Sequence, residues 1–528
     1  IAITFVSCSD QEIDTVKPDA GQVAPIIDLP EGATQGRILV KFKPEAASFL
    51  DAATTRSVGA ALTRSGISDM DAVLQRIGTS KLERIFPVDN RTEERTRKAG
   101  LNLWYIIHFD KDTDLEQVAK DLSQVADVAK VQFTRAIQRS YDPNVRATVL
   151  TKQAMTRVVH TTRAVNTDAN DPFFNLQWGC KNDGSILQNG EKNDKGDNVV
   201  PAVMGVDVNC GEAWKLCTGN PSIVVAVLDE GVMYDHPDLE GNIWVNEDET
   251  FASKEDADGN GYAGDRYGYN FTDDKGYISY DDPNDTGHGT HVAGIISAVR
   301  NNGEGISGIA GGDKANNRGG VKIMSCQVFS GSKGCDLYQE AKAVKYAADN
   351  GAVILQCSWG YNSGLSNPIS GYTPGFTSDK DWVDAAPLEK EAFDYFLHNA
   401  GSPNDVIDGG IIVFAAGNEY AAMAGYPGAY PDYISVAALA ADGTPSCYSN
   451  YAMGVSIAAP GGDSDYHQSS KGKIYSTLPP SANEDGGENS HYGYMEGTSQ
   501  ACPHISGVAA LGLSYACLLY TSPSPRDK

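Results

Sequence analysis

The sequence predicts an α/β protein in which a parallel β-sheet flanked by helices follows a small α+β domain. With 528 residues, the chain is longer than one ordinary core requires, so two domains with connecting segments are expected. Residues 36–138 contain strand and helix patterns in the order β-α-β-β-α-β. After residue 170, short apolar strands alternate with helices, which is typical of a parallel sheet.

The order of elements in residues 36–138 is that of a ferredoxin-like sandwich. Alternating apolar and polar residues predict strands with one buried face, and apolar residues that recur every three or four positions predict amphipathic helices. The expected strands cover residues 37–43, 82–88, 103–109 and 128–134, and the expected helices lie near residues 69–77 and 114–125.

The second domain is expected within residues 171–516. Ligands of an open parallel sheet bind at the carboxyl ends of its strands. Asp229, Ser358 and Asn418 each come just after a predicted strand, so their side chains are expected along one edge. The predicted strands are residues 223–228, 322–328, 352–357 and 411–416, and the predicted helices are residues 288–299, 336–349 and 499–513.

Charge is distributed unevenly along the chain, whose formal net charge is −27. Residues 36–165 carry 21 basic and 15 acidic side chains, a net charge of +6, whereas residues 166–528 carry 20 basic and 48 acidic ones, a net charge of −28. Opposite charge favours docking between the two parts, although ordinary solvation of two unrelated surfaces gives the same pattern. The acidity argues against nucleic acid as a partner.

Three short glycine-rich segments supply an acid, a base and a nucleophile in that order. Asp229 ends a valine-rich strand, His288 stands in Gly-His-Gly-Thr-His, and Ser499 follows Gly-Thr. A serine hydroxyl is a weak nucleophile unless a base takes its proton, and the base needs a third group that fixes its tautomer. Asp229, His288 and Ser499 are therefore the candidates for a catalytic triad.

In this order, the three segments resemble the catalytic motifs of the subtilisin-like serine peptidases, the subtilase or S8 family. The resemblance covers about residues 171–516 and implies the subtilisin-like fold. It also implies an endopeptidase that hydrolyses peptide bonds through an acyl-enzyme, with no cofactor for catalysis. Of the two histidines in the second motif, the resemblance assigns catalysis to His288 and a structural role to His291.

Two further segments match this family. Asn418, in Phe-Ala-Ala-Gly-Asn-Glu, corresponds to the oxyanion-hole donor, whose amide stabilises the tetrahedral intermediate. Ser358, Trp359 and Gly360 resemble the segment that lines the substrate cleft and pairs with the main chain of the substrate as an added strand. A plain turn after a strand is the alternative at both places.

Two positions depart from the pattern of the family. Glu230 stands where a small hydroxyl residue is usual, and Gln500 replaces the usual methionine after the nucleophile. A second carboxylate beside Asp229 can raise the pKa of one of the two, although we expect Glu230 to point away. Neither departure removes a catalytic group, so both bear on the rate and the pH optimum.

The acidic loop at residues 256–265 predicts a structural Ca²⁺ site. It places oxygen ligands at its first, third and fifth positions and a glycine at the sixth, as at the start of a calcium-binding loop. Because Tyr267 stands at position 12, the loop is not an EF-hand, and a solvated acidic turn is the alternative. The candidate ligands are the side chains of Asp256, Asp258, Asn260 and Asp265 and the carbonyl group of Tyr262.

Both ends of the chain carry signals of processing. The first residues resemble the end of a bacterial lipoprotein signal with Cys8 as the acylated residue, followed by an acidic tether like that of Bacteroidetes-type surface lipoproteins; a plain secretory signal is the alternative. Residues 517–528 resemble a translated sequencing adapter, so the natural chain is expected to continue past Ala516.

The resemblance also implies how the parts of the chain work together. Residues 36–138 match the small inhibitory propeptides of the family by position and pattern, with a plain adaptor domain as the alternative. The segment after them lacks apolar periodicity and is expected to be cut on maturation. The expected parts are a signal remnant and tether at residues 1–35, a propeptide-like domain at 36–138, a cleavable linker at 139–170, a catalytic domain at 171–516 and an adapter-derived tail at 517–528.

The sequence therefore predicts a secreted serine endopeptidase that is made as a zymogen. Its expected partners are protein or peptide substrates, its own propeptide as an intramolecular inhibitor, and a membrane through the lipid anchor. The expected location is the bacterial cell envelope or the medium, with the protein anchored on the outer surface. A catalytically silent binding module of the same fold and a serine esterase are the alternatives; the esterase is disfavoured because Ser499 lies outside any Gly-x-Ser-x-Gly turn.

Overall fold

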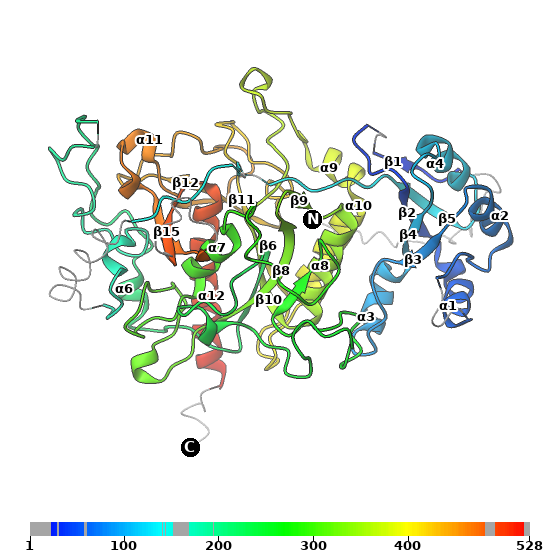
Figure 1. Cartoon of the computed structure of the whole chain (residues 1–528), viewed down its shortest axis with the longest axis horizontal. Coiled ribbons are helices and arrows are strands. Elements are labelled where there is room, and N and C mark those ends of the chain that lie inside the picture. The colour runs from blue at the N-terminus through cyan, green and yellow to red at the C-terminus, as the bar shows by residue number, and fades with distance from the viewer. Residues whose placement is uncertain are drawn as a thin grey trace, which may run out of the picture. The chain divides into compact units, whose positions relative to one another are not determined.

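The computed structural model describes residues 23–28, 31–56, 61–139, 141–142, 144–150, 168–193, 195–480 and 491–521. Cys8 and residues 151–167 of the expected linker lie outside these residues. The chain forms two compact units (Figure 1). The first comprises Ile1–Pro30, Gln35–Glu83 and Tyr105–Phe133, and the second comprises Glu31–Thr34, Arg84–Trp104 and Thr134–Lys528.

A five-stranded mixed sheet forms the centre of the first unit, in the order β1-β5-β2-β4-β3. Helix α4 packs on β5 and β2, and the Asp114 carboxylate caps its first turn by accepting hydrogen bonds from two backbone amides. The predicted small α+β domain is confirmed. Its elements are β1 (Ile26–Ile27), β2 (Arg37–Phe42), α1 (Ala47–Arg56), α2 (Ser68–Arg76), β3 (Lys81–Arg84), β4 (Trp104–His108), α4 (Leu115–Ser123) and β5 (Val128–Gln132).

The helices that were not expected from the sequence include α1 and α3 (Glu93–Lys98). Helix α1 mixes small and polar residues, and α3, which belongs to the second unit, consists of charged residues and one threonine. Neither has the apolar stripe by which a helix is recognised in a sequence. Strand β3 ends at Arg84, earlier than expected, and Pro87, which follows it, cannot donate a backbone hydrogen bond.

The second unit is built on a sheet in the order β13-β12-β11-β10-β6-β8-β7, in which all neighbouring strands run parallel; β9 pairs with β8 in the antiparallel sense. Helices α7 and α12 and helices α8 and α10 flank this sheet (Figure 1). The predicted parallel sheet with flanking helices is confirmed. Its strands are β6 (Val224–Glu230), β7 (Gly268–Asn270), β8 (Lys322–Ser330), β9 (Lys333–Gly334), β10 (Ala352–Cys357), β11 (Ile411–Ala415), β12 (Ile434–Leu439) and β13 (Ile457–Pro460).

Besides the helices on the sheet, the second unit carries short helices and a two-stranded antiparallel sheet of β14 (Ile474–Thr477) and β15 (Tyr492–Met495). Apart from α3, the α-helices of the second unit are α6 (Cys210–Ala213), α7 (His288–Ser297), α8 (Leu337–Asp349), α9 (Asp379–Ala385), α10 (Pro387–Asn399), α11 (Ser464–His467) and α12 (Thr498–Thr521).

Helix α12 runs past the predicted end of the helical pattern. By length and composition, Thr498–Tyr520 is apolar enough to cross a membrane, yet half of its apolar window is buried inside the protein. The helix packs on β10, β11, β12 and β13 and on α7. It is therefore placed as a core helix of the second unit.

The register of the central strands brings their carboxyl ends to one edge of the sheet. Leu228 of β6 pairs with Cys357 of β10, which pairs with Phe414 of β11. Asp229 and Ser358 each follow directly on a member of this row, as the strand pattern predicts.

The contact between α7 and β6 leaves no room for a side chain at Gly289. A Cβ atom there would lie 2.1 Å from the carbonyl oxygen of Glu230. We expect Gly289→Ala to lower the free energy of unfolding by about 2 kcal/mol or more, because backbone must shift to relieve the clash. Thermal unfolding followed by circular dichroism measures this effect.

Gly512 in α12 is the control, because a Cβ atom there meets nothing within 4 Å. Gly512→Ala is expected to raise stability by up to about 1 kcal/mol, since alanine has the higher helix propensity. Equal effects of the two substitutions would contradict the packing described for α7.

Candidate active site

A buried carboxylate and a buried imidazole meet at the carboxyl end of β6. Asp229 lies near the end of this strand, and His288 is the first residue of α7, after Gly287 in the left-handed conformation (φ 77°). His288 Nδ1 lies 2.9 Å from both carboxylate oxygens of Asp229. Its Nε2 is buried and makes no hydrogen bond within the described part of the chain. The pair therefore fixes one ring nitrogen and leaves the other available as a base.

His291, the second histidine of the motif, has a different environment. Its Nε2 lies 3.2 Å from the carbonyl oxygens of Ile474 and Gly493, so a neutral ring donates to them. Burial first, and then the neighbouring His288, lowers the pKa of His291 to about 3. A ring that stays neutral and binds two backbone carbonyls joins α7 to β14 and β15, which supports a structural role.

Ser499 lies in the first turn of α12, after Gly497 with φ 151°. Its hydroxyl donates a hydrogen bond to the carbonyl oxygen of Ser358 at 3.2 Å, and the Ser358 hydroxyl donates to the Ser499 carbonyl oxygen at 2.8 Å. These two bonds join the start of α12 to the end of β10. They hold the candidate nucleophile at the same edge of the sheet as Asp229.

The side chain of Asn418 is held in one orientation. Its amide oxygen accepts hydrogen bonds from the backbone nitrogen and the hydroxyl group of Thr498, both at 2.9 Å. The NH₂ group is consequently directed away from Thr498. Behind it, Asn450 is fully buried, donates to the carbonyl oxygen of Ala416 at 2.9 Å and accepts from the backbone nitrogen of Glu419 at 3.2 Å.

The predicted substrate-binding segment turns its side chains inward. Ser358 is fully buried, and the Trp359 indole, 2% exposed, donates a hydrogen bond to the carbonyl oxygen of Leu228 at 2.9 Å. Gly360 is half-buried. The side chains of Ser358 and Trp359 are therefore not available to a substrate, and the pairing of this segment with the substrate main chain stays a prediction.

Glu230, which departs from the pattern of the family, binds backbone groups of the loop that leads into His288. Its Oε2 accepts hydrogen bonds from the backbone nitrogens of Thr286 at 2.9 Å and His288 at 3.0 Å. The side chain is 1% exposed. It therefore fixes the loop that carries His288.

A cavity of about 610 Å³ opens beside these groups, and residues of the expected linker form part of its lining. The Tyr141 ring stacks on the His288 ring with centroids 3.8 Å apart and an angle of 15° between the planes. The Tyr141 hydroxyl donates to Glu230 at 3.0 Å. Residues that line this cavity include Arg139, Tyr141, Val145, Arg146, His288, Asn418, Gly497 and Gln500.

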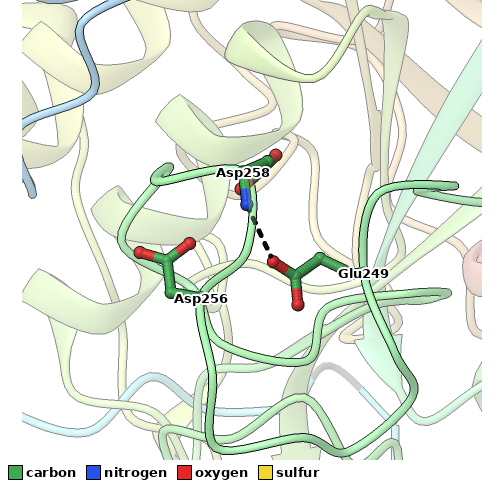
Figure 2. A group of neighbouring side chains, drawn as sticks. All are labelled: Glu249, Asp256 and Asp258. Atoms are coloured by element: carbon green, nitrogen blue, oxygen red, sulfur yellow. Dashed lines mark hydrogen bonds between the residues drawn. The ribbon is translucent and has the colours of Figure 1, made fainter.

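The acidic loop brings two of the predicted calcium ligands together with a third carboxylate. One oxygen each from Glu249, Asp256 and Asp258 lies within 4.8 Å of the others (Figure 2). Glu249 also accepts hydrogen bonds from the backbone nitrogens of Ala257 and Asp258, which shape the loop around it. Sequence reasoning missed Glu249, because it lies outside the spacing of the loop motif. Three carboxylates form an oxygen donor set of the kind that hard cations prefer.

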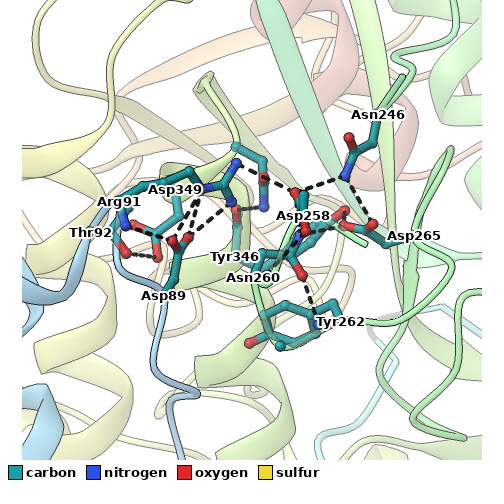
Figure 3. A network of polar contacts seen from close by, with 12 residues as sticks. Asp89, Arg91, Thr92, Asn246, Asp258, Asn260, Tyr262, Asp265, Tyr346 and Asp349 are labelled. Carbon is teal, nitrogen blue, oxygen red and sulfur yellow. Dashed lines mark hydrogen bonds and ion pairs between the residues drawn. The ribbon is translucent and has the colours of Figure 1, made fainter. Parts of the chain in front are cut away.

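The other predicted ligands lie in a hydrogen-bond network behind this cluster (Figure 3). The Asn260 amide group donates to Asp258 and Asp265, and its oxygen accepts from the backbone nitrogen of Tyr262. Asp265 also accepts from the Tyr346 hydroxyl at 2.8 Å, and burial raises its pKa to about 6. That these three residues bind a metal stays a prediction.

Arg91 connects the segment around α3 to the same loop. Its guanidinium group lies 2.9 Å from Asp89 and 3.4 Å from Asp258 (Figure 3). It therefore places a positive charge at the edge of the carboxylate cluster.

The comparisons with known proteins assign the chain to a family. Residues 220–521 match the model of the subtilase family, described as "Subtilase family", and residues 38–184 match that of the "N-terminal of Subtilase family". Since the first match spans more than half of the chain, the protein belongs to the subtilase family.

Two curated relatives and one solved structure add detail. Halolysin of Haloferax mediterranei is 30% identical over 309 residues, 58% of this chain and 44% of its own length. The halolysin-like extracellular serine protease Nep of Natrialba magadii is 29% identical over 308 residues, 58% of this chain and 43% of its own length. The chain thus spans less than half the length of both.

In structure, the chain is similar to fervidolysin from Fervidobacterium pennivorans, described as a keratinolytic enzyme related to subtilisin. The TM-score is 0.52 at 23% sequence identity, over 95% of this chain and 57% of that one. This similarity supports the fold.

The buried amide of Asn450 gives a test of the geometry around Asn418. Asn450→Asp would set a carboxylate against the carbonyl oxygen of Ala416 and the side chain of Glu419, which now accept hydrogen bonds from this amide. We expect a loss of about 3 kcal/mol in the free energy of unfolding, because an unpaired charge is buried. Thermal or chemical unfolding measures it.

Asn317 is a suitable control, because it is exposed and also carries an amide. We expect Asn317→Asp to change stability by less than about 0.5 kcal/mol. If Asn450→Asp is tolerated equally well, the hydrogen-bond network behind Asn418 is not formed as described.

Proposed function

We propose that the chain is a serine endopeptidase that uses Asp229, His288 and Ser499 as its catalytic triad. The observation that carries this proposal is the buried Asp229–His288 pair, whose second ring nitrogen has no hydrogen-bond partner in the described residues. His288 lines the same cavity as Asn418. Membership of the subtilase family and the similarity to Nep, an extracellular serine protease, support it.

In the proposed mechanism, the Ser499 hydroxyl turns from the Ser358 carbonyl, attacks the carbonyl carbon of the substrate and passes its proton to His288 Nε2. Asp229 stabilises the resulting imidazolium ion, and the Asn418 amide donates to the oxyanion. The proton then goes to the leaving amine, which gives an acyl-enzyme. Water hydrolyses this ester by the same proton transfers.

We further propose that the protein is made as a zymogen. The Tyr141 ring covers the His288 ring and so occupies space that a substrate needs. The chain must therefore be cut and residues 139–150 must leave before substrate enters. This supports residues 36–138 as an inhibitory propeptide-like domain and residues 139–170 as its cleavable linker.

The triad is tested by substitution in the full chain. Ser499→Ala and His288→Gln are each expected to lower kcat/KM for casein-derived peptides by at least about 10⁴-fold, because nucleophile and base act as a unit. Ser499→Ala is also expected to keep its full mass over time, while the wild type loses its N-terminal part.

His291→Gln is the matched control for the base. Glutamine can still donate to the Ile474 and Gly493 carbonyls, so we expect a lower melting temperature but retained turnover in the folded protein. Turnover retained by His288→Gln and lost in His291→Gln would exchange the two roles. If the folded wild type cleaves neither peptides nor esters, even after trace trypsin, the protein is a catalytically silent binding module. If it cleaves esters alone, it is an esterase.

Asn418→Ala tests the oxyanion hole separately. We expect kcat to fall by about 10²- to 10³-fold with little change in KM, because the donor acts only on the charge that develops in the transition state. Steady-state kinetics at saturating peptide measure the two constants. A change in KM alone would assign Asn418 to substrate binding.

We propose that Glu249, Asp256 and Asp258 hold a structural Ca²⁺ ion. When bound, such an ion cross-links the loop and supplies no step of the hydrolysis. With Ca²⁺ at about 100 times its Kd, we expect about 3 kcal/mol of added stability. Melting temperatures with calcium and with a chelator measure this.

Glu249→Gln is expected to abolish the effect of calcium on the melting temperature, and Glu255→Gln, an exposed change in the same loop, to leave it intact. An equal calcium response in both variants would rule out the cluster as the site.

For location, we propose that the protein acts outside the cytoplasm, anchored by a lipid on Cys8. The relative Nep, whose name describes an extracellular protease, supports the first part. The resemblance of the N-terminal residues to a lipoprotein signal supports the second. Metabolic labelling with a radioactive fatty acid, with Cys8→Ala as the control, tests the anchor.

A further inference from the structure

An arginine of the linker fills an acidic pocket beside the proposed base. The Arg139 guanidinium group lies 3.4 Å from the Glu230 carboxylate and 3.6 Å from the Asp285 carboxylate. It donates a hydrogen bond to the carbonyl oxygen of Gly331 at 2.7 Å and lies 5.0 Å from the centre of the Phe329 ring. The Arg139 side chain is only 8% exposed.

This acidic pocket, formed by Glu230, Asp285, Phe329 and Gly331, is built from rigid and buried parts. Glu230 and Asp285 are 1% and 2% exposed. Asp285 Oδ1 accepts from the backbone nitrogen of Gly331 at 2.7 Å, and its Oδ2 is buried without a hydrogen-bond partner in the described part of the chain. The walls belong to β6, to the loop before α7 and to the end of β8, so they remain when the linker leaves.

Two buried carboxylates without a cation are unfavourable. Burial and the neighbouring Glu230 raise the pKa of Asp285, and the Arg139 guanidinium opposes this rise and so favours the carboxylate. Departure of the linker removes Arg139 and the Tyr141 hydroxyl from Glu230. The pocket then favours any new positive group that can reach both carboxylates.

Arginine fits this pocket better than lysine. A planar guanidinium group can donate to the Gly331 carbonyl, face both carboxylates and lie against the Phe329 ring at the same time. An ammonium group is a point charge with a larger hydration shell and cannot satisfy all of these partners.

We propose that the acidic pocket is a substrate subsite that binds an arginine side chain and so gives this endopeptidase a preference for peptides that carry arginine close to the cleaved bond. The proposal rests on the proposed function, because a substrate must enter the cavity that the linker lines. In this view, the side chains of Arg139 and Tyr141 occupy the place of a substrate, with Tyr141 on the base and Arg139 in the pocket.

The first experiment measures specificity. The full-length protein, after it has processed itself, is given peptides in which each position in turn is Arg, Lys or Gln. At one position, we expect kcat/KM for Arg to exceed that for Gln by about tenfold or more, with Lys between them, because a buried charged hydrogen bond is lost with Gln. A ratio near one at every position would overturn the proposal.

Substitutions in the acidic pocket test whether its two carboxylates cause this preference, because the Arg-to-Gln ratio is measured within each variant. Asp285→Asn and Glu230→Gln are expected to reduce the Arg-to-Gln ratio to less than about threefold, since each removes one charge that faces the guanidinium group. Asp281→Asn makes the same chemical change at an exposed position and should keep the ratio. An equal fall in Asp281→Asn would assign the preference to the general negative field.

A second experiment separates this proposal from the proposed function, because it needs no catalysis. In full-length Ser499→Ala protein, hydrogen exchange of residues 144–150 reports whether the linker stays in the cavity. We expect Arg139→Gln to speed this exchange by about tenfold and Arg139→Lys by less. If exchange rises as expected but no peptide is cleaved, the pocket stands and the peptidase function fails. If peptides are cleaved and exchange does not change with Arg139→Gln, the pocket fails and the function stands.

Discussion

The buried pair of Asp229 and His288 is the contact on which the rest of the site depends. A carboxylate and an imidazole at 2.9 Å, 1% and 3% exposed, require neighbours that fix both of them. The parallel register of β6 and β10 supplies one side, and the close approach of Gly289 to β6 supplies the other. Breaking this pair would leave a charge without a partner in the core.

Glu230 connects the loop of the proposed base with the linker. Glu230 binds the backbone in front of His288 and also faces the linker through Tyr141 and Arg139. The Glu230 side chain thus fixes the loop that carries the base and also contacts the linker. A small hydroxyl residue at this position could not do both, so the departure from the pattern of the family acquires a physical role.

The sequence predicted the elements whose signal is local. The valine-rich run before Asp229 and the glycines around His288 and Ser499 predicted the sheet edge and the candidate triad, because strand burial and chain order are visible in sequence. It did not predict Glu249 in the carboxylate cluster or Arg139 in the acidic pocket. Both depend on contacts between residues far apart in the chain, and neither residue has a periodic or spacing signal of its own.

The most direct test of the account is whether Ser499 is a reactive nucleophile. A fluorophosphonate is added to the full-length protein before and after trace trypsin removes the linker, and the adduct is located by mass spectrometry. The account predicts one adduct, on Ser499, that forms faster after trypsin and is absent from His288→Gln. An adduct on another serine, or none in a folded and trypsin-treated protein, would contradict it.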